Sequence, residues 1–161
     1  MANPGLLDYP HMVNEAGMDA IINNTRVRAT PSNPLGVNYI DGIGTPISIT
    51  PTTSVTLTAA QLLTGVITIK ATNATTVTFD TAANIVAAVN NSTAGAVVGD
   101  YLSVLIVNGA TATSTLTLAV STGVTYDTNQ ANSTIPVATS RYVLIRLTNV
   151  TPGSEACVVY L

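Results

Sequence analysis

Few residues of this chain could carry acid–base or nucleophilic chemistry. The sequence holds one histidine, His11, and one cysteine, Cys157. A catalytic nucleophile needs a base within hydrogen-bond reach, and neither residue has a local partner of that kind. Cys157 lies in an apolar run, where a small buried side chain is typical. The sequence therefore predicts no catalytic residues and a protein that is not an enzyme; a hydrolase that uses His11 as its base is the enzymatic alternative.

Two motifs resemble ligand sites and lack essential parts. Gly42-Ile43-Gly44 has neither the third glycine nor the helix of a phosphate-binding loop, so we interpret it as a joint. Asp127-Thr128-Asn129 offers oxygen ligands for Ca²⁺, but the glycine and the final carboxylate of an EF-hand loop are missing. A solvated loop is the simpler interpretation. We predict no cofactor and no metal.

The charge and hydropathy of the chain argue against nucleic-acid and membrane partners. The 161 residues carry a net charge of −3, and their basic residues form no cluster larger than Arg26-Val27-Arg28. Nucleic-acid binding requires several basic contacts to phosphate, so we predict no nucleic-acid partner. No stretch reaches the ~18 apolar residues of a membrane helix, and residues 1–10 lack the basic and apolar regions of a signal peptide. We therefore predict no membrane partner and synthesis in the cytoplasm without export.

The composition leaves little charge to cover a surface. Only 8% of the residues are charged, while mean hydropathy is +0.43. The outside is therefore expected to be covered by Thr, Ser and Asn, and in part by other subunits. A monomer with a threonine-rich surface is the alternative.

The clearest structural pattern is the alternation of apolar and polar residues between Val97 and Val120. In Tyr101–Val107 the residues Leu102, Val104 and Ile106 fall on one side, and Thr115–Val120 alternates in the same way. A period of two indicates strands. Because Asn108-Gly109 opens the loop between them, we predict an antiparallel hairpin here.

Other stretches alternate in the same way, and two have helix-start signals. Thr58–Gln61 forms a capping-box pattern, and Thr81 is a candidate N-cap for a helix over Thr81–Val89. Thr151-Pro152-Gly153-Ser154 predicts a tight turn. The predicted fold class is all-β: a β-sandwich or jelly-roll-like domain with two short helical insertions. Its further strands are expected in Ser54–Leu57, Val66–Lys70, Thr76–Phe79, Gly123–Tyr126, Thr134–Val137, Tyr142–Thr148 and Ala156–Leu161.

The N-terminal part differs from the rest. Residues 1–51 contain six of the eight prolines, and their apolar residues keep no steady period. Residues 10–24 could form a short helix, and residues 30–46 contain too many breakers for a regular element. We predict an N-terminal arm over residues 1–49, made of a short helix and an extended strap, followed by the β domain over residues 50–161.

One predicted strand exposes apolar residues. If Val143, Ile145 and Leu147 face the core, then Tyr142 and Leu144 face outward beside Arg146. We predict a subunit interface at Tyr142, Leu144 and Arg146. The alternative is that a helix or the arm covers this face.

Four segments of the β domain share features with a known class of protein: Thr56–Ile67, Val98–Gly109, Leu116–Tyr126 and Ser140–Leu161. They contain a GD-aromatic strand, a TGVT strand and a TNVTPGSEA turn. On these motifs, residues 50–161 resemble small β-sandwich virion proteins of tailed bacteriophages and other double-stranded DNA viruses, of the head-decoration (cement) and head-fibre type.

The resemblance implies a homotrimer on the capsid surface of a virion, bound to the major capsid protein where subunits meet. An arm that becomes ordered on the shell could bridge several subunits. The alternative is a receptor- or glycan-binding fibre protein that uses the loops 108–114 and 127–133. The residues expected to anchor the arm on the capsid are apolar: Leu6, Leu7, Tyr9, Met12, Leu35, Val37, Tyr39 and Ile40.

Overall fold

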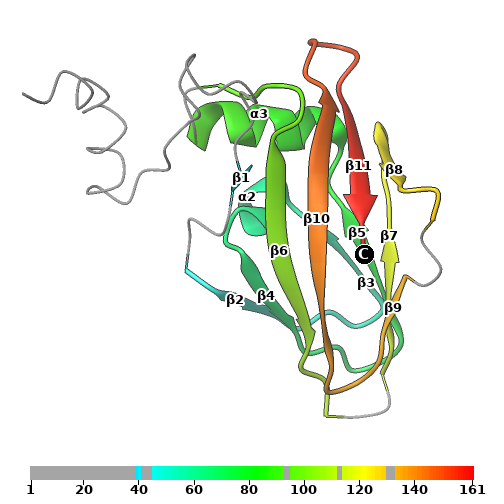
Figure 1. Cartoon of the computed structure of the whole chain (residues 1–161). Coiled ribbons are helices and arrows are strands. Elements are labelled where there is room, and N and C mark those ends of the chain that lie inside the picture. The colour runs from blue at the N-terminus through cyan, green and yellow to red at the C-terminus, as the bar shows by residue number, and fades with distance from the viewer. Residues whose placement is uncertain (1–38, 41–44, 93–94, 112–113, 130–132) are drawn as a thin grey trace, which may run out of the picture. The chain divides into compact units, whose positions relative to one another are not determined.

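The computed structural model describes residues 39–40, 45–92, 95–111, 114–129 and 133–161. They form a mostly-β fold with two sheets and few helices (Figure 1). The strands are β1 (Tyr39–Ile40), β2 (Ile47–Ile49), β3 (Ser54–Leu57), β4 (Val66–Ile69), β5 (Thr75–Phe79), β6 (Tyr101–Asn108), β7 (Leu116–Ala119), β8 (Val124–Tyr126), β9 (Thr134–Ile135), β10 (Ser140–Asn149) and β11 (Ala156–Tyr160), and the helices are α2 (Ala59–Leu62) and α3 (Ala82–Ser92).

The chain passes back and forth between the two sheets. The seven-stranded sheet has the order β2-β4-β6-β10-β11-β8, with β1 also paired to β6, and the four-stranded sheet has the order β3-β5-β7-β9. From β2 to β9 each strand is followed by one in the other sheet (Figure 1). Within the series β2-β4-β6 and β3-β5-β7, neighbouring strands are therefore one full turn of the chain apart. This winding makes β2, β4 and β6 parallel to one another, and likewise β3, β5 and β7.

The sequence repeats along with this winding. Ile47-Ser48-Ile49 pairs residue for residue with Ile67-Thr68-Ile69, and Ser54–Leu57 pairs with Thr76–Phe79. Helices α2 and α3 follow the second strand of their turns and return the chain to the larger sheet. Successive turns thus place like residues side by side, as in stacked repeats.

The predicted hairpin between residues 97 and 120 is wrong, because β6 and β7 lie in different sheets. β6 pairs with β4 and β10, whereas β7 pairs with β5 and β9. The Asn108 side chain explains the departure: its amide donates to the carbonyl oxygens of Ser114 (2.8 Å) and Ile135 (3.0 Å). Asn108 therefore holds in place the segment that leads from β6 in one sheet to β7 in the other.

The predicted inward faces are confirmed. Leu102, Val104 and Ile106 of β6 are buried, as are Val143, Ile145 and Leu147 of β10. One core cluster joins residues from both sheets with the inner side of α3. Among its largest fully buried side chains are Leu57, Leu62, Ile67, Ile69, Phe79, Ile85, Leu116 and Ile135.

Both helical insertions are confirmed, and one carboxylate connects their first residues. Thr58 caps α2 in a capping box with Gln61. Asp80 Oδ2 accepts the backbone N–H of Ala59 at the start of α2, while its Oδ1 accepts that of Thr81 just before α3 (both 2.8 Å). Asn84 donates a third hydrogen bond to Asp80. Asp80 thereby satisfies donors that would otherwise lack partners at helix starts.

The predicted turn at Thr151–Ser154 is confirmed. It joins β10 to β11, which pair antiparallel. The Ser154 N–H donates to the Thr151 carbonyl oxygen at 2.9 Å, and Gly153 has φ +81°. A proline followed by a glycine with positive φ is typical of a type II turn.

Candidate interaction surface

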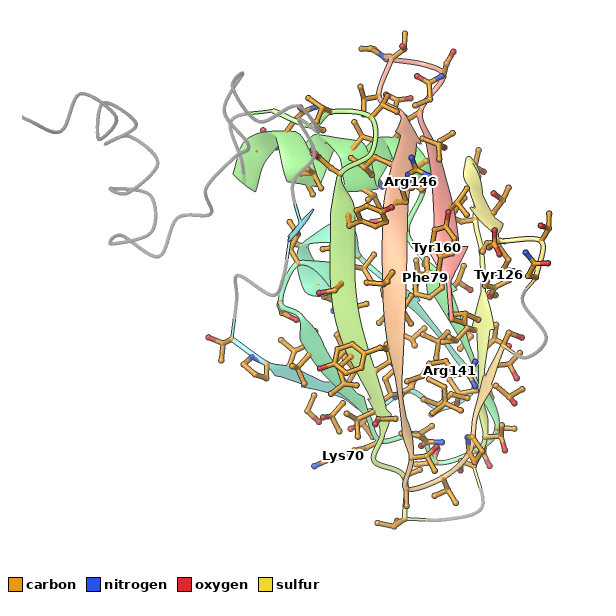
Figure 2. The ribbon with its side chains drawn as sticks, in the orientation of Figure 1. Lys70, Phe79, Tyr126, Arg141, Arg146 and Tyr160 are labelled. Carbon is orange, nitrogen blue, oxygen red and sulfur yellow. The ribbon has the colours of Figure 1, made fainter. Side chains whose placement is uncertain are left out.

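The outer side of β10 carries the three residues predicted as an interface. Tyr142 is 67% exposed, and Leu144 and Arg146 are partly exposed, while the alternating residues between them are buried. The prediction that these side chains face away from the core is confirmed; that they form a subunit interface stays a prediction. Figure 2 shows Arg146 on β10 and Tyr160 on the adjacent β11.

Strand register extends this surface beyond β10. Tyr142 is paired with Leu105 of β6, and Leu144 with Tyr160 of β11. Leu105 is in turn paired with Val66 of β4. We name this surface the β10 face; its outward side chains, partly or fully exposed, are Val66, Tyr101, Leu105, Val107, Tyr142, Leu144, Arg146, Val158 and Tyr160.

Arg146 is the one charged side chain on the β10 face within the bounds of β4, β6, β10 and β11. Its guanidinium carbon lies 5.8 Å from the centroid of the Tyr101 ring. Its Nε is buried and has no hydrogen-bond partner among the described residues. Contact with an aromatic ring compensates a guanidinium only in part when it is withdrawn from water. The cation is therefore suited to a further electron-rich partner.

The four-stranded sheet presents the opposite chemistry. Its outward positions hold hydroxyl side chains except at Ala119, and register places Ser54 beside Thr76, Thr76 beside Thr117, and Thr117 beside Thr134. We name this surface the threonine face; it consists of Ser54, Thr56, Thr76, Thr78, Thr117 and Thr134. β-branched hydroxyl residues keep strand geometry while remaining solvated. The four-stranded sheet therefore exposes polar side chains to water, whereas the seven-stranded sheet exposes apolar and aromatic groups.

Sequence reasoning found part of the β10 face and missed the rest. Six further outward residues complete it, and each was assigned to a strand without regard to its outward side: Val66, Tyr101, Leu105, Val107, Val158 and Tyr160. Alternation could have identified them, since each stands two residues from another outward residue. What alternation lacks is the order of strands, which brings them onto one face with Leu144.

The predicted arm falls mostly outside the described residues. Leu6, Leu7, Tyr9, Met12, Leu35 and Val37 lie there, and their assignment as capsid anchors stays a prediction. Tyr39 and Ile40 form β1, which pairs in parallel with Tyr101 and Leu102 of β6. β1 and β2 therefore add to the larger sheet from within the range 1–49.

The described residues include one buried thiol and no candidate metal cluster. Cys157 is 1% exposed, and burial raises the pKa of its thiol to about 12, which suppresses the reactive thiolate. No cluster of three or more His, Cys, Asp or Glu residues able to hold a metal occurs in this part of the chain. A shallow depression of about 370 Å³ beside Lys70 and Gly109 is lined by threonines and alanines, with no acid or aromatic group.

The described segments also contain no helix long and apolar enough to cross a membrane. Comparison of the chain with protein-family models, curated proteins and solved structures gives no match. The β10 face is therefore the feature from which a function is inferred.

Proposed function

We propose that this chain is a structural virion protein that decorates the outside of a phage head, binds the major capsid protein where subunits meet, and stabilises the shell. The observation that carries the proposal is the contrast between the β10 face and the threonine face. A sheet face with Val66, Leu105 and Leu144 outward is typical of a surface that another protein covers. The resemblance to decoration proteins is what points to the major capsid protein as the partner.

The finer architecture belongs to the same proposal. Two sheets that share one core are consistent with a β-sandwich. We propose that this sandwich is wound from successive parallel turns, because β2-β4-β6 and β3-β5-β7 pair in parallel, whereas jelly rolls are antiparallel.

The low share of charged residues is compatible with a binding role. A decoration protein acts by holding neighbouring subunits together, which requires contact area and multiple attachment points rather than reactive groups. The predicted arm would add further attachment points through apolar residues such as Leu6, Leu7 and Tyr9.

The test is co-sedimentation of the purified full-length chain with heads of the phage that carries its gene. Saturable binding that raises the temperature at which the heads release DNA supports the proposal. A chain that stays in the supernatant at micromolar concentration overturns it. The variant Leu6→Ser/Leu7→Ser/Tyr9→Ser tests the arm. This variant should lower the amount of protein bound to the heads, and Thr56→Lys serves as a control.

A glycan array with the same full-length protein separates the fibre alternative. Specific glycan binding without head binding would identify a receptor-binding protein instead. The two measurements use the same preparation, so misfolding is excluded by either positive result.

A further inference from the structure

We infer that the β10 face binds a second copy of this chain about a two-fold axis that passes over Leu144. Tyr142, Leu144 and Arg146 project in a row from β10, and Leu144 stands midway between the other two. Two copies packed face to face with antiparallel β10 strands would set Tyr142 of each against Arg146 of the other. In such an isologous contact every pair is made twice.

The same operation matches the neighbouring strands. Leu144 is in register with Ser103 of β6, so Tyr101 and Leu105, two residues on either side of Ser103, exchange places across the axis. Ser103, which is 2% exposed, is covered and does not protrude from the middle of β6. Large side chains therefore meet large ones at both ends of β6, with a small side chain between them.

On the other flank of β10, register places Tyr160 of β11 beside Leu144. Tyr160 therefore lies close to the axis and would meet its own counterpart. An offset aromatic pair at this position would add contact energy beyond the burial of its area. The face is thus self-complementary on β6, β10 and β11 together.

Charge complementarity singles out the Tyr142 and Arg146 pair. Arg146 already lies 5.8 Å from the Tyr101 ring and keeps a buried Nε without a partner among the described residues. The partner copy would bring the exposed Tyr142 ring to the other side of the guanidinium. A cation between two aromatic rings is stabilised more strongly once water is excluded. No acid on the partner is required.

The dimensions of the face suit a homodimer. Strands β4, β6, β10 and β11 lie ~4.8 Å apart and rise ~3.4 Å per residue, which gives an apolar footprint of roughly 20 by 24 Å. That footprint supplies the apolar core of an interface in which each partner buries ~800 Å². Polar residues at its margin, Ser48, Thr68, Thr125 and Thr148, would form the rim.

The test compares two substitutions of opposite charge at position 142 in the full-length chain. Tyr142→Glu places a carboxylate against Arg146 of the partner, and Tyr142→Lys places an ammonium there. Light scattering after size exclusion and sedimentation equilibrium measure the dimer dissociation constant of each. Both substitutions remove the same exposed ring, and Thr56→Lys on the threonine face controls for added charge.

A dimer in the wild type, kept in Tyr142→Glu and weakened at least about tenfold in Tyr142→Lys, supports the inference. Salt should then weaken the Tyr142→Glu dimer more than the wild type. A wild-type monomer, a trimer, or equal weakening by both substitutions overturns it. The two-fold dimer stands in place of the trimer that the resemblance implies, so a trimer would favour that expectation instead. Because head binding is measured separately, the two-fold contact can fail while the proposed decoration function stands.

Discussion

Arg146 and Tyr101 stand opposite each other on neighbouring strands, and the guanidinium carbon of Arg146 lies 5.8 Å from the centroid of the Tyr101 ring. The pair lies at one end of the β10 face. It brings the one cation of that face onto an aromatic surface and leaves Nε buried without a hydrogen bond among the described residues. The relationship links the fold of one chain to its proposed self-association, because the cation is only partly satisfied within the chain.

The first prediction concerns this cation. Arg146→Leu should change the unfolding free energy by less than about 1 kcal/mol, because the loss of a cation–π contact is offset by removal of a buried unpaired N–H. Self-association should weaken at the same time. Urea unfolding measures the first and sedimentation the second. A loss of stability above about 2 kcal/mol would show that Arg146 acts mainly within its own chain.

The second prediction concerns the pKa of Asp80. Desolvation raises this pKa, but hydrogen bonds from Asn84, Ala59 and Thr81 outweigh it, so the pKa is lowered in the folded protein. A carboxyl group whose pKa falls on folding contributes stability above its unfolded pKa of ~4 and loses it as pH drops further. The unfolding free energy should therefore decrease as the pH drops below about 4. Urea titrations between pH 2.5 and 7 measure this.

Asp80→Asn provides the matched control for the acid. The amide keeps the shape but removes the charge, so at pH 7 the variant should lose about 1 kcal/mol, and its stability should vary less with pH below 4 than that of the wild type. If both proteins lose stability in parallel from pH 5 to 2.5, other carboxyl groups cause the acid sensitivity.

The third prediction concerns Asn108. Its Nδ2 donates hydrogen bonds to the carbonyl oxygens of Ser114 and Ile135, and its Oδ1 accepts one from the N–H of Ala110 at 3.2 Å. Asn108→Ala removes all three of these buried hydrogen bonds and should cost about 3 kcal/mol. Asn108→Asp should be as damaging at pH 7, because a carboxylate would face two carbonyl oxygens. Chemical unfolding measures both, and a cost below about 1 kcal/mol would show that water replaces the side chain.

The inward faces could be predicted from the sequence, whereas the strand partners could not. Alternation in Tyr101–Val107 correctly assigns Leu102, Val104 and Ile106 to the core, because the side-chain period of a strand is a local property. The partner of a strand, in contrast, depends on the path that the rest of the chain takes. Asn108-Gly109 favours a hairpin locally, but the Asn108 side chain also donates to the carbonyl oxygen of Ile135, 27 residues away, which a window of a few residues does not contain.

A different sequence signal could have revealed the parallel pairing. Ile47-Ser48-Ile49 and Ile67-Thr68-Ile69 are alike, and each is followed by a short loop, a second strand and an alanine-containing helix. Self-similarity at a spacing of ~20 residues is characteristic of repeats that stack in parallel. The candidate site was accessible only in part for the same reason, since strand order assembles the β10 face.

The fourth prediction concerns the thiol of Cys157. It is 1% exposed and its pKa is raised to about 12, so the folded protein should not react with a thiol reagent at pH 8. Reaction should occur at the rate of unfolding and accelerate with urea. Cys157→Ala should keep the fold and abolish the signal. Rapid modification of the native protein would show that β11 opens locally.

The last prediction compares two glycines with similar backbone angles and different surroundings. Gly123 has φ +76° and Gly153 has φ +81°. A Cβ at Gly123 would lie 2.7 Å from the Glu155 carbonyl oxygen and 2.8 Å from Ala82 Cβ, whereas a Cβ at Gly153 would meet nothing within 4 Å. Each alanine substitution incurs the strain of a left-handed conformation, of order 1 kcal/mol.

Only Gly123→Ala adds the clash, which displaces backbone where β8 begins beside α3. The Gly123 carbonyl oxygen accepts the N–H of Cys157 at 2.9 Å, so a shift there also disturbs the pairing of β8 with β11. We expect Gly153→Ala to cost about 1 kcal/mol and Gly123→Ala at least about 3 kcal/mol, measured by thermal and urea unfolding. Equal costs would mean that the backbone around Gly123 yields to a methyl group, and that close packing between β8 and α3 is not what requires glycine there.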